Sequence, residues 1–153
     1  MILISHRGNL DGPTPKEENR VEYIENALEE GYQVEVDVWW WDGFYLGHDE
    51  PEYPIDLNWL SDPRLWIHCK NLPAVKELQL TRLNYFWHES DEYTLTSHGW
   101  IWAYPGKYME PGTNSIAVLP EIHNTDTTNY KGICTDYVWD YIVETDFICF
   151  FFF

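Results

Sequence analysis

Basic residues are scarce in this sequence, which carries nine lysines and arginines against 26 aspartates and glutamates. The formal net charge at pH 7 is therefore −17. Phosphate backbones and anionic membranes repel so acidic a chain, so we expect no nucleic-acid partner and no attraction to such membranes. A phosphate-bearing substrate must then be small, and it is expected to need a bound cation.

Cysteine and long apolar runs are also scarce. The three cysteines are odd in number and lack the spacing of a metal site, which favours a reducing, cytoplasmic setting. No positively charged, apolar leader opens the sequence. No apolar run approaches the roughly 20 residues needed to span a membrane. The apolar residues 149–153 are too few for a span and fit a terminal strand, a plug or a sticky tail.

Large apolar side chains are abundant by contrast. Hydrophobic residues make up 44% of the 153 residues and aromatic residues 18%, which excludes disorder despite the charge. The length is enough for one hydrophobic core and predicts a single domain over residues 1–153. Aromatic side chains on exposed strand faces would favour self-association as a homo-oligomer.

Short apolar runs separated by turn-rich segments predict eight strands, over residues 2–5, 33–39, 44–47, 65–69, 84–87, 100–103, 115–119 and 132–135. Helical spacing of apolar residues predicts helices over 21–30 and 73–80, with a weaker one over 137–143. Strands with interspersed helices predict an α/β fold, a compact (β/α)8 TIM-type barrel. Such barrels usually take about 250 residues, so several helices must be shortened or missing. A different α/β arrangement is the alternative.

Two acidic residues share one face of the predicted strand Gln33–Trp39. Strand alternation places three valines on the other face, so Glu35 and Asp37 point the same way. Two carboxylates on a closed interior face repel each other unless a proton or a cation separates them, and a hard divalent cation is the natural partner. The competing interpretation is an edge strand whose acids face water.

Two histidines follow predicted strands on either side of this acidic pair. The first strand delivers His6 and Arg7 at its end, and His48 follows the strand over residues 44–47. Histidine titrates near neutral pH, whereas arginine presents a fork suited to phosphate oxygens. The set indicates acid–base chemistry on a phosphate group.

The order and spacing of five short motifs resemble those of glycerophosphodiester phosphodiesterases, in the superfamily of phospholipase-C-like phosphodiesterases. The motifs are His6-Arg7-Gly8, Glu18-Asn19, Glu35-x-Asp37, Asp42-Gly43 and His48-Asp49. Further along, residues 66–70 resemble the family's strand ending in Glu-x-Lys, and residues 132–137 resemble its last strand. The resemblance thus covers most of the chain, with firm registration over residues 5–49.

This resemblance implies a metal-dependent hydrolase of a small phosphodiester, with a place in lipid metabolism. His6 and His48 match the catalytic base and acid, while Arg7 and Lys70 match groups that hold phosphate charge. Glu35 and Asp37 match ligands of Mg²⁺ or Ca²⁺, with Mn²⁺ as a further option. Glu18 matches a residue that completes the metal shell directly or through water, and Trp102 matches a pocket residue. The alternative is a non-catalytic barrel that still binds phosphate or metal but has lost turnover.

One position departs from the family pattern. His68 stands where the family has a third acidic metal ligand, two residues before Lys70. Imidazole is a poorer ligand than carboxylate for Mg²⁺ or Ca²⁺ and a better one for Mn²⁺ or Zn²⁺. Three alternatives stay open: a softer metal bound by His68, recruitment of Glu89 in its place, or a weakly bound metal.

Overall fold

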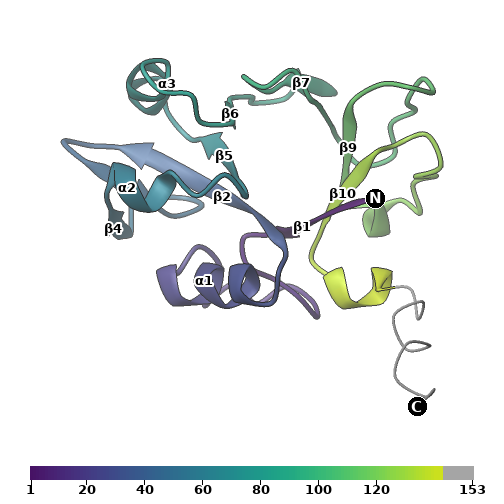
Figure 1. The fold of residues 1–153 in the computed structure, drawn as a ribbon, viewed down its shortest axis with the longest axis horizontal. Helices are drawn as coiled ribbons and strands as arrows, with labels where there is room; N and C mark the ends of the chain where they lie inside the picture. The colour runs from purple at the N-terminus through teal and green to yellow at the C-terminus, as the bar shows by residue number, and fades with distance from the viewer. Residues whose placement is uncertain (143–153) are drawn as a thin grey trace, which may run out of the picture.

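A mixed sheet of ten strands organises the computed structural model, which describes residues 1–142 (Figure 1). Seven of the strands run parallel in the order β6-β5-β2-β1-β10-β9-β8. Hairpins add β3 beside β2, β4 beside β3 and β7 beside β8, all antiparallel. The strands are β1 (Ile2–His6), β2 (Gln33–Trp40), β3 (Phe44–Leu46), β4 (Tyr53–Ile55), β5 (Leu65–Cys69), β6 (Tyr85–Phe86), β7 (Tyr93–Leu95), β8 (Ile101–Ala103), β9 (Ser115–Val118) and β10 (Gly132–Thr135).

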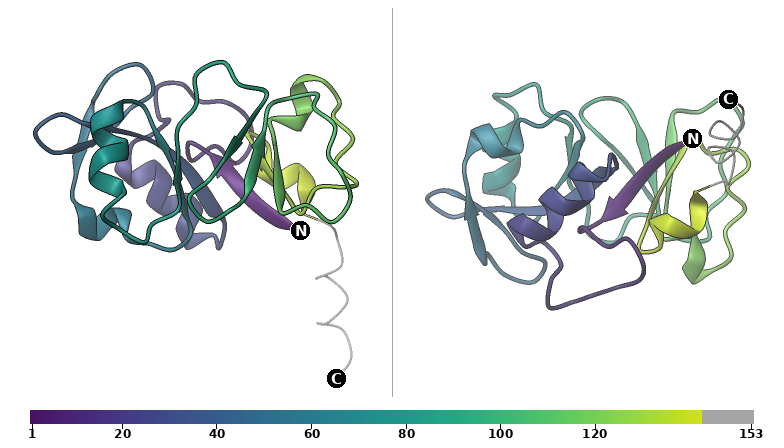
Figure 2. Two further views of the ribbon diagram at one scale, coloured as in Figure 1. Left: turned by 90° about the horizontal axis from the view of Figure 1, so that it is seen from above. Right: turned by 60° about the horizontal axis from the view of Figure 1, so that its bottom comes forward.

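Helices are few and short. The described residues contain α1 (Val21–Glu29), α2 (Leu57–Leu60) and α3 (Leu72–Leu78), with 3₁₀ turns η1 (Pro120–Ile122) and η2 (Val138–Tyr141). The three α-helices lie near β2, whereas β8, β9 and β10 are joined through loops and η1 (Figures 1 and 2). None of the helices within residues 1–142 has both the length and the apolar character needed to cross a membrane.

The prediction of a (β/α)8 barrel was wrong. A barrel of that class alternates strands with helices, and each parallel crossover usually takes a dozen or more residues. Here the chain makes antiparallel hairpins from β2 to β3, from β3 to β4 and from β7 to β8, and a hairpin needs only a short turn. These hairpins fit ten strands into the chain and leave a mixed sheet in place of the helix-rich barrel.

The individual elements were predicted better than their arrangement. All eight expected strands are present, with ends that match or differ by one residue, and the helices expected over 21–30 and 73–80 are present with ends shifted by at most two residues. The strands β4 and β7 were missed because each has only three residues, and neither contains a buried residue. The helix expected over 137–143 is the 3₁₀ turn η2; residue 143 and the apolar run 149–153 lie outside the described residues.

The alternation predicted for β2 separates the core from the site. Val34, Val36 and Val38 are completely buried in a cluster that also contains apolar residues of α1 and α3. Glu35 and Asp37 therefore project from the opposite face of β2. A second cluster joins residues of six parallel strands, from β6 at one end of the parallel order to β8 at the other, and contains Ile4, Trp66, Phe86, Trp102, Ile116 and Cys134.

Asn71 ties α3 to the end of β2. Its Oδ1 accepts hydrogen bonds from the backbone N–H groups of Ala74, at 3.1 Å, and Trp40, at 3.2 Å, while its Nδ2 donates to the Trp40 carbonyl at 3.0 Å. Asp56 caps α2 with a single hydrogen bond, accepted from the Trp59 N–H at 2.8 Å. Loss of the Asn71 side chain would therefore leave three backbone groups without their partner, whereas loss of the Asp56 side chain would leave one.

We predict that Asn71→Ala lowers the free energy of unfolding by about 2 kcal/mol and Asp56→Ala by about 1 kcal/mol. The larger loss follows because Asn71→Ala removes the helix cap and also both contacts with β2. Urea denaturation of the two variants measures the difference. Equal losses would contradict the role given to Asn71.

Candidate active site

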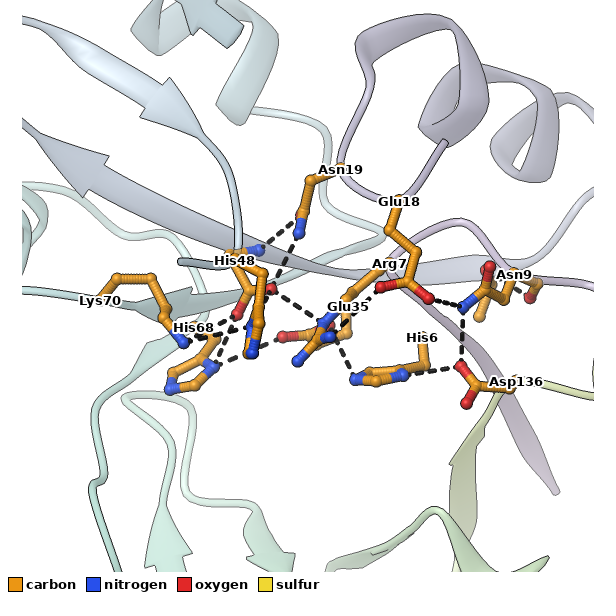
Figure 3. Close-up of polar contacts among 12 residues, drawn as sticks. His6, Arg7, Asn9, Glu18, Asn19, Glu35, His48, His68, Lys70 and Asp136 are labelled. Carbon is orange, nitrogen blue, oxygen red and sulfur yellow. Dashed lines mark hydrogen bonds and ion pairs between the residues drawn. The ribbon is translucent and has the colours of Figure 1, made fainter. Parts of the chain in front are cut away.

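Neighbouring parallel strands bring the predicted site residues together. His6 of β1 lies opposite Glu35 of β2, and Asp37 lies opposite His68 of β5. Parallel strands end at the same edge of a sheet, so the residues that follow them also meet there. Figure 3 shows Arg7, Lys70 and Asp136 directed toward this group from the ends of β1, β5 and β10.

A cavity of about 560 Å³ opens over these side chains. Its polar lining includes His6, Arg7, Glu35, His48, His68 and Lys70, all predicted from the sequence. Aromatic and aliphatic residues, among them Trp87 and Trp102, complete the lining. One pocket therefore combines titratable and cationic groups with an apolar wall.

The carboxylate of Asp37 is completely buried and lies at the centre of the polar group. Arg7 Nε is 2.9 Å from Asp37 Oδ2, and Lys70 Nζ is 3.6 Å from Oδ1. Asn19 donates from Nδ2 to Oδ2 at 2.8 Å and accepts the Asp37 N–H at 2.9 Å. The buried negative charge is thus surrounded by positive charge and hydrogen-bond donors.

Two histidines also contact Asp37. His68 Nδ1 is 3.0 Å from Oδ1, and His48 Nδ1 is 3.3 Å from Oδ2. Burial by itself would raise the pKa of Asp37, but the hydrogen bonds of His48 and His68 and the charge of Arg7 outweigh it and hold the pKa well below its ordinary value. Asp37 is consequently ionised throughout the physiological range of pH.

Glu35, Asp37 and His68 form a group suited to a metal ion. Their ligand atoms all lie within 4.8 Å of one another. Glu35 Oε2 is buried and has no hydrogen-bond partner among residues 1–142, so it retains an acceptor that a cation could satisfy. Carboxylate oxygens are the usual ligands of hard divalent cations. The competing interpretation of solvent-facing acids fails, because Glu35 is only 2% exposed and Asp37 is 0% exposed.

Glu18 and Glu89 lie outside this three-residue group. Glu18 Oε2 pairs with Arg7 Nη1 at 3.3 Å, and Glu18 Oε1 accepts a hydrogen bond from Asn9 Nδ2 at 2.9 Å. Its contacts orient the arginine. Glu89 lines the cavity but is not one of the grouped ligands. Of the residues considered as a third ligand from the sequence, His68 is the one that lies beside Glu35 and Asp37.

Arg7 owes its position to an unusual backbone. Its φ is +56° and that of Gly8 is +93°, both in the left-handed region, while the Arg7 N–H donates to the Glu35 carbonyl at 3.0 Å. A Cβ at position 8 would lie 2.6 Å from Tyr23 Cδ1. Glycine at position 8 therefore permits both the turn and the close approach that follow β1.

His6 is oriented by a residue that the sequence reasoning missed. Its Nδ1 is 2.7 Å from Asp136 Oδ1, and its Nε2 is 3.9 Å from Glu35 Oε2. Asn9 Nδ2 donates to the same Asp136 oxygen at 2.8 Å. Burial opposes protonation of His6, but the hydrogen bond with Asp136 and the charge of Glu35 outweigh it and raise the pKa of His6. A signal was present, because Asp136 directly follows a strand predicted to resemble the last strand of the family.

The other catalytic candidate, His48, is less enclosed. It follows β3, and 44% of its side chain is exposed. Lys70 Nζ lies 3.5 Å from His48 Nδ1, so these two predicted residues share the same side of the cavity. His48 therefore has access both to the polar group and to solvent.

Two more residues of the site were missed. The ring of His88 stacks on that of His68 with centroids 4.5 Å apart, and the hydroxyl of Tyr104 contacts His88 Nδ1. Burial, followed by the charge of His68, lowers the pKa of His88 to about 4. His88 was missed because no short motif marks it in the sequence. Its place beside His68 comes from ring stacking between residues of neighbouring strands.

Trp102 serves the core and the cavity together. It is 3% exposed, and its ring centroid lies 4.7 Å from that of Phe86 and 5.7 Å from that of Trp66. It also lines the cavity, as expected for a pocket residue. The packing of Trp102 against Phe86 and Trp66 thus holds one wall of the cavity in place.

We predict that Asp136→Asn lowers the pKa of His6 in metal-free protein, because the variant removes the carboxylate that stabilises the imidazolium. Nuclear magnetic resonance titration of the His6 ring protons measures the change. Asp126→Asn is the control, since Asp126 bonds locally to Thr128 and its loss should leave His6 unchanged. An unaltered pKa in Asp136→Asn would refute this account of the pair.

Comparison of the chain with protein-family models, with curated proteins and with solved structures finds no match.

Proposed function

We propose that this protein hydrolyses a small phosphodiester of the glycerophosphodiester type, using two histidines and a bound divalent cation. The observation that carries the proposal is one cavity lined by His6, His48, Arg7, Lys70 and the Glu35–Asp37–His68 group. The sequence resemblance to glycerophosphodiester phosphodiesterases supports the same chemistry. Since the fold is not the expected barrel, the proposal rests on these residues and their geometry.

Proton transfer is assigned to His6 and His48. Asp136 holds Nδ1 of His6 and leaves Nε2 on the side of Glu35. From there, neutral His6 removes a proton from the attacking water or from a neighbouring substrate hydroxyl. As the new P–O bond forms and the ester P–O bond breaks, His48 gives a proton to the departing alkoxide. Water yields a phosphomonoester and an alcohol, whereas the neighbouring hydroxyl yields a cyclic phosphate and the same alcohol.

Binding of the phosphate and neutralisation of its charge are assigned to the cationic side chains and the metal group. Arg7 presents a planar fork suited to two phosphate oxygens, and Lys70 adds a compact positive charge. Glu35, Asp37 and His68 would hold Mg²⁺, Ca²⁺ or Mn²⁺. Such a cation would neutralise phosphate charge and stabilise the charged transition state.

A second candidate function is binding of phosphate or metal without turnover. The observation that favours it is the arrangement around Asp37, which already pairs with both Arg7 and Lys70. A phosphate must compete with this carboxylate for both cations. A protein that binds its ligand but keeps the ion pairs of Asp37 with Arg7 and Lys70 intact would show affinity without hydrolysis.

We predict that the purified protein with Mg²⁺, Mn²⁺ or Ca²⁺ cleaves glycerophosphodiesters, and that His6→Ala and His48→Ala each reduce kcat by about 100-fold or more. Each variant removes a group that must accept or donate a proton. His98→Ala is the matched control, because His98 bonds to the Arg82 carbonyl and does not line the cavity. Release of the alcohol measures the rate.

The outcomes separate the two functions. Full activity in both His6→Ala and His48→Ala would refute the proposed mechanism. Binding of glycerol phosphate in a calorimeter, without hydrolysis by the unaltered protein under any of the three metals, would favour the binding function. Loss of activity in His98→Ala would show that the assay reports general damage to the fold.

A further inference from the structure

We propose that the metal group selects a first-row transition-metal ion, represented by Mn²⁺ or Zn²⁺, over Mg²⁺ and Ca²⁺. This inference rests on the metal site of the proposed function and specifies its ion. The ligand set contains two carboxylates and one imidazole, from Glu35, Asp37 and His68. Imidazole favours transition metals, whereas Mg²⁺ and Ca²⁺ prefer oxygen ligands throughout.

The ligands are held by a paired region of the sheet. Asp37 of β2 and His68 of β5 are register partners in a parallel ladder, and Glu35 precedes Asp37 by two residues on the same face. All three side chains therefore leave regular strands rather than loops (Figure 3). A site on such a scaffold keeps its ligand geometry better than one on loops.

The ring of His68 is fixed with a nitrogen toward the carboxylates. Its Nδ1 lies 3.0 Å from Asp37 Oδ1 and 3.7 Å from Glu35 Oε1. Its ring lies within 6° of parallel to the rings of His88, 4.5 Å away, and Phe86, 5.1 Å away. Only 12% of the side chain is exposed. Rotation of the ring away from the site would disrupt both stacks, so the imidazole nitrogen is a built-in part of the ligand set.

An unpaired buried oxygen supplies a second observation. Glu35 Oε2 lacks a hydrogen-bond partner within residues 1–142, although Glu35 is only 2% exposed. Leaving a buried polar atom unpaired is costly. The Nδ1 of His68 carries at most one proton, so it cannot donate to both carboxylates. A metal ion could bind an oxygen of each and Nδ1 together.

Nearby positive charge strengthens the preference. Arg7 Nε and Lys70 Nζ face Asp37 at 2.9 and 3.6 Å. These groups weaken the electrostatic attraction of any divalent cation to the carboxylates. Mg²⁺ and Ca²⁺ depend mainly on that attraction, whereas Mn²⁺ and Zn²⁺ also gain from the bond to imidazole.

Calorimetric titration of the metal-free protein with Mn²⁺, Zn²⁺, Mg²⁺ and Ca²⁺, each alone, tests the proposal. We expect Mn²⁺ to bind at least about tenfold more tightly than Mg²⁺, and His68→Glu to reduce this ratio by about tenfold. His68→Glu replaces the imidazole with a third carboxylate while leaving Glu35 and Asp37 in place. Loss of the electron paramagnetic resonance signal of free Mn²⁺ measures Mn²⁺ binding by a second method.

Two controls locate the effect. Glu35→Gln should weaken binding of all four metals, because it removes a charged ligand that each would share. His98→Gln should leave the affinity for each metal unchanged. A lower Zn²⁺ affinity in this variant would mean that the titration had measured Zn²⁺ binding to exposed His98 rather than to the metal group. Circular dichroism checks that each variant is folded; if His68→Glu is not, His68→Asn removes the imidazole with a smaller side chain.

Equal or tighter binding of Mg²⁺ by the unaltered protein would overturn the proposal, as would an unchanged Mn²⁺/Mg²⁺ ratio in His68→Glu or in its substitute His68→Asn. These failures are distinct from failure of the proposed function. Hydrolysis with a preference for Mg²⁺ would refute the metal assignment alone. Selective Mn²⁺ or Zn²⁺ binding without hydrolysis would refute the enzyme assignment alone.

Discussion

A carboxylate without contact to water requires compensating charge, and the site is arranged around one such group. Asp37 is fully buried, and its oxygens lie near Arg7, Lys70 and two histidines. Removal of a single partner from such a group costs more than the contact itself contributes, because the charge stays buried. The positions of the phosphate-binding candidates therefore depend on this one acid. Access of a ligand to the site depends on whether it can replace the partners of Asp37.

The site needs only part of the sheet. Apart from His48, which follows β3, Asp136 and the residues assigned to proton transfer, phosphate binding and the metal group lie on or directly after β10, β1, β2 and β5. These four strands are consecutive neighbours in parallel pairing. The remaining strands complete the core and the cavity wall. This explains how site residues that were expected in a helix-rich barrel can meet in a ten-stranded mixed sheet with few helices. The chemistry requires adjacent strand ends and does not require a helix after each strand.

Local patterns in the sequence were enough to predict most strands and the face of β2 that carries the acidic residues. The alternation of valine and acid in β2 correctly separated the buried Val36 face from the face of Glu35 and Asp37. The short hairpins could not be foreseen, because β4 and β7 have too few residues for a detectable period. Asp136 and His88 act through contacts with His6 and His68, which are distant in sequence. Pairings of this kind depend on strand order, which apolar periodicity does not determine.

The two catalytic candidates differ in how the chain holds them. His6 ends β1, which is paired on both sides by β2 and β10, whereas His48 follows the short hairpin strand β3 and is nearly half exposed. Residues 48–50 are all exposed, and segments with few buried contacts open at lower free energy than the centre of a sheet. Local opening of this segment would withdraw His48 and leave Glu35, Asp37 and His68 in place. The position of His48 can thus vary independently of the ligand set.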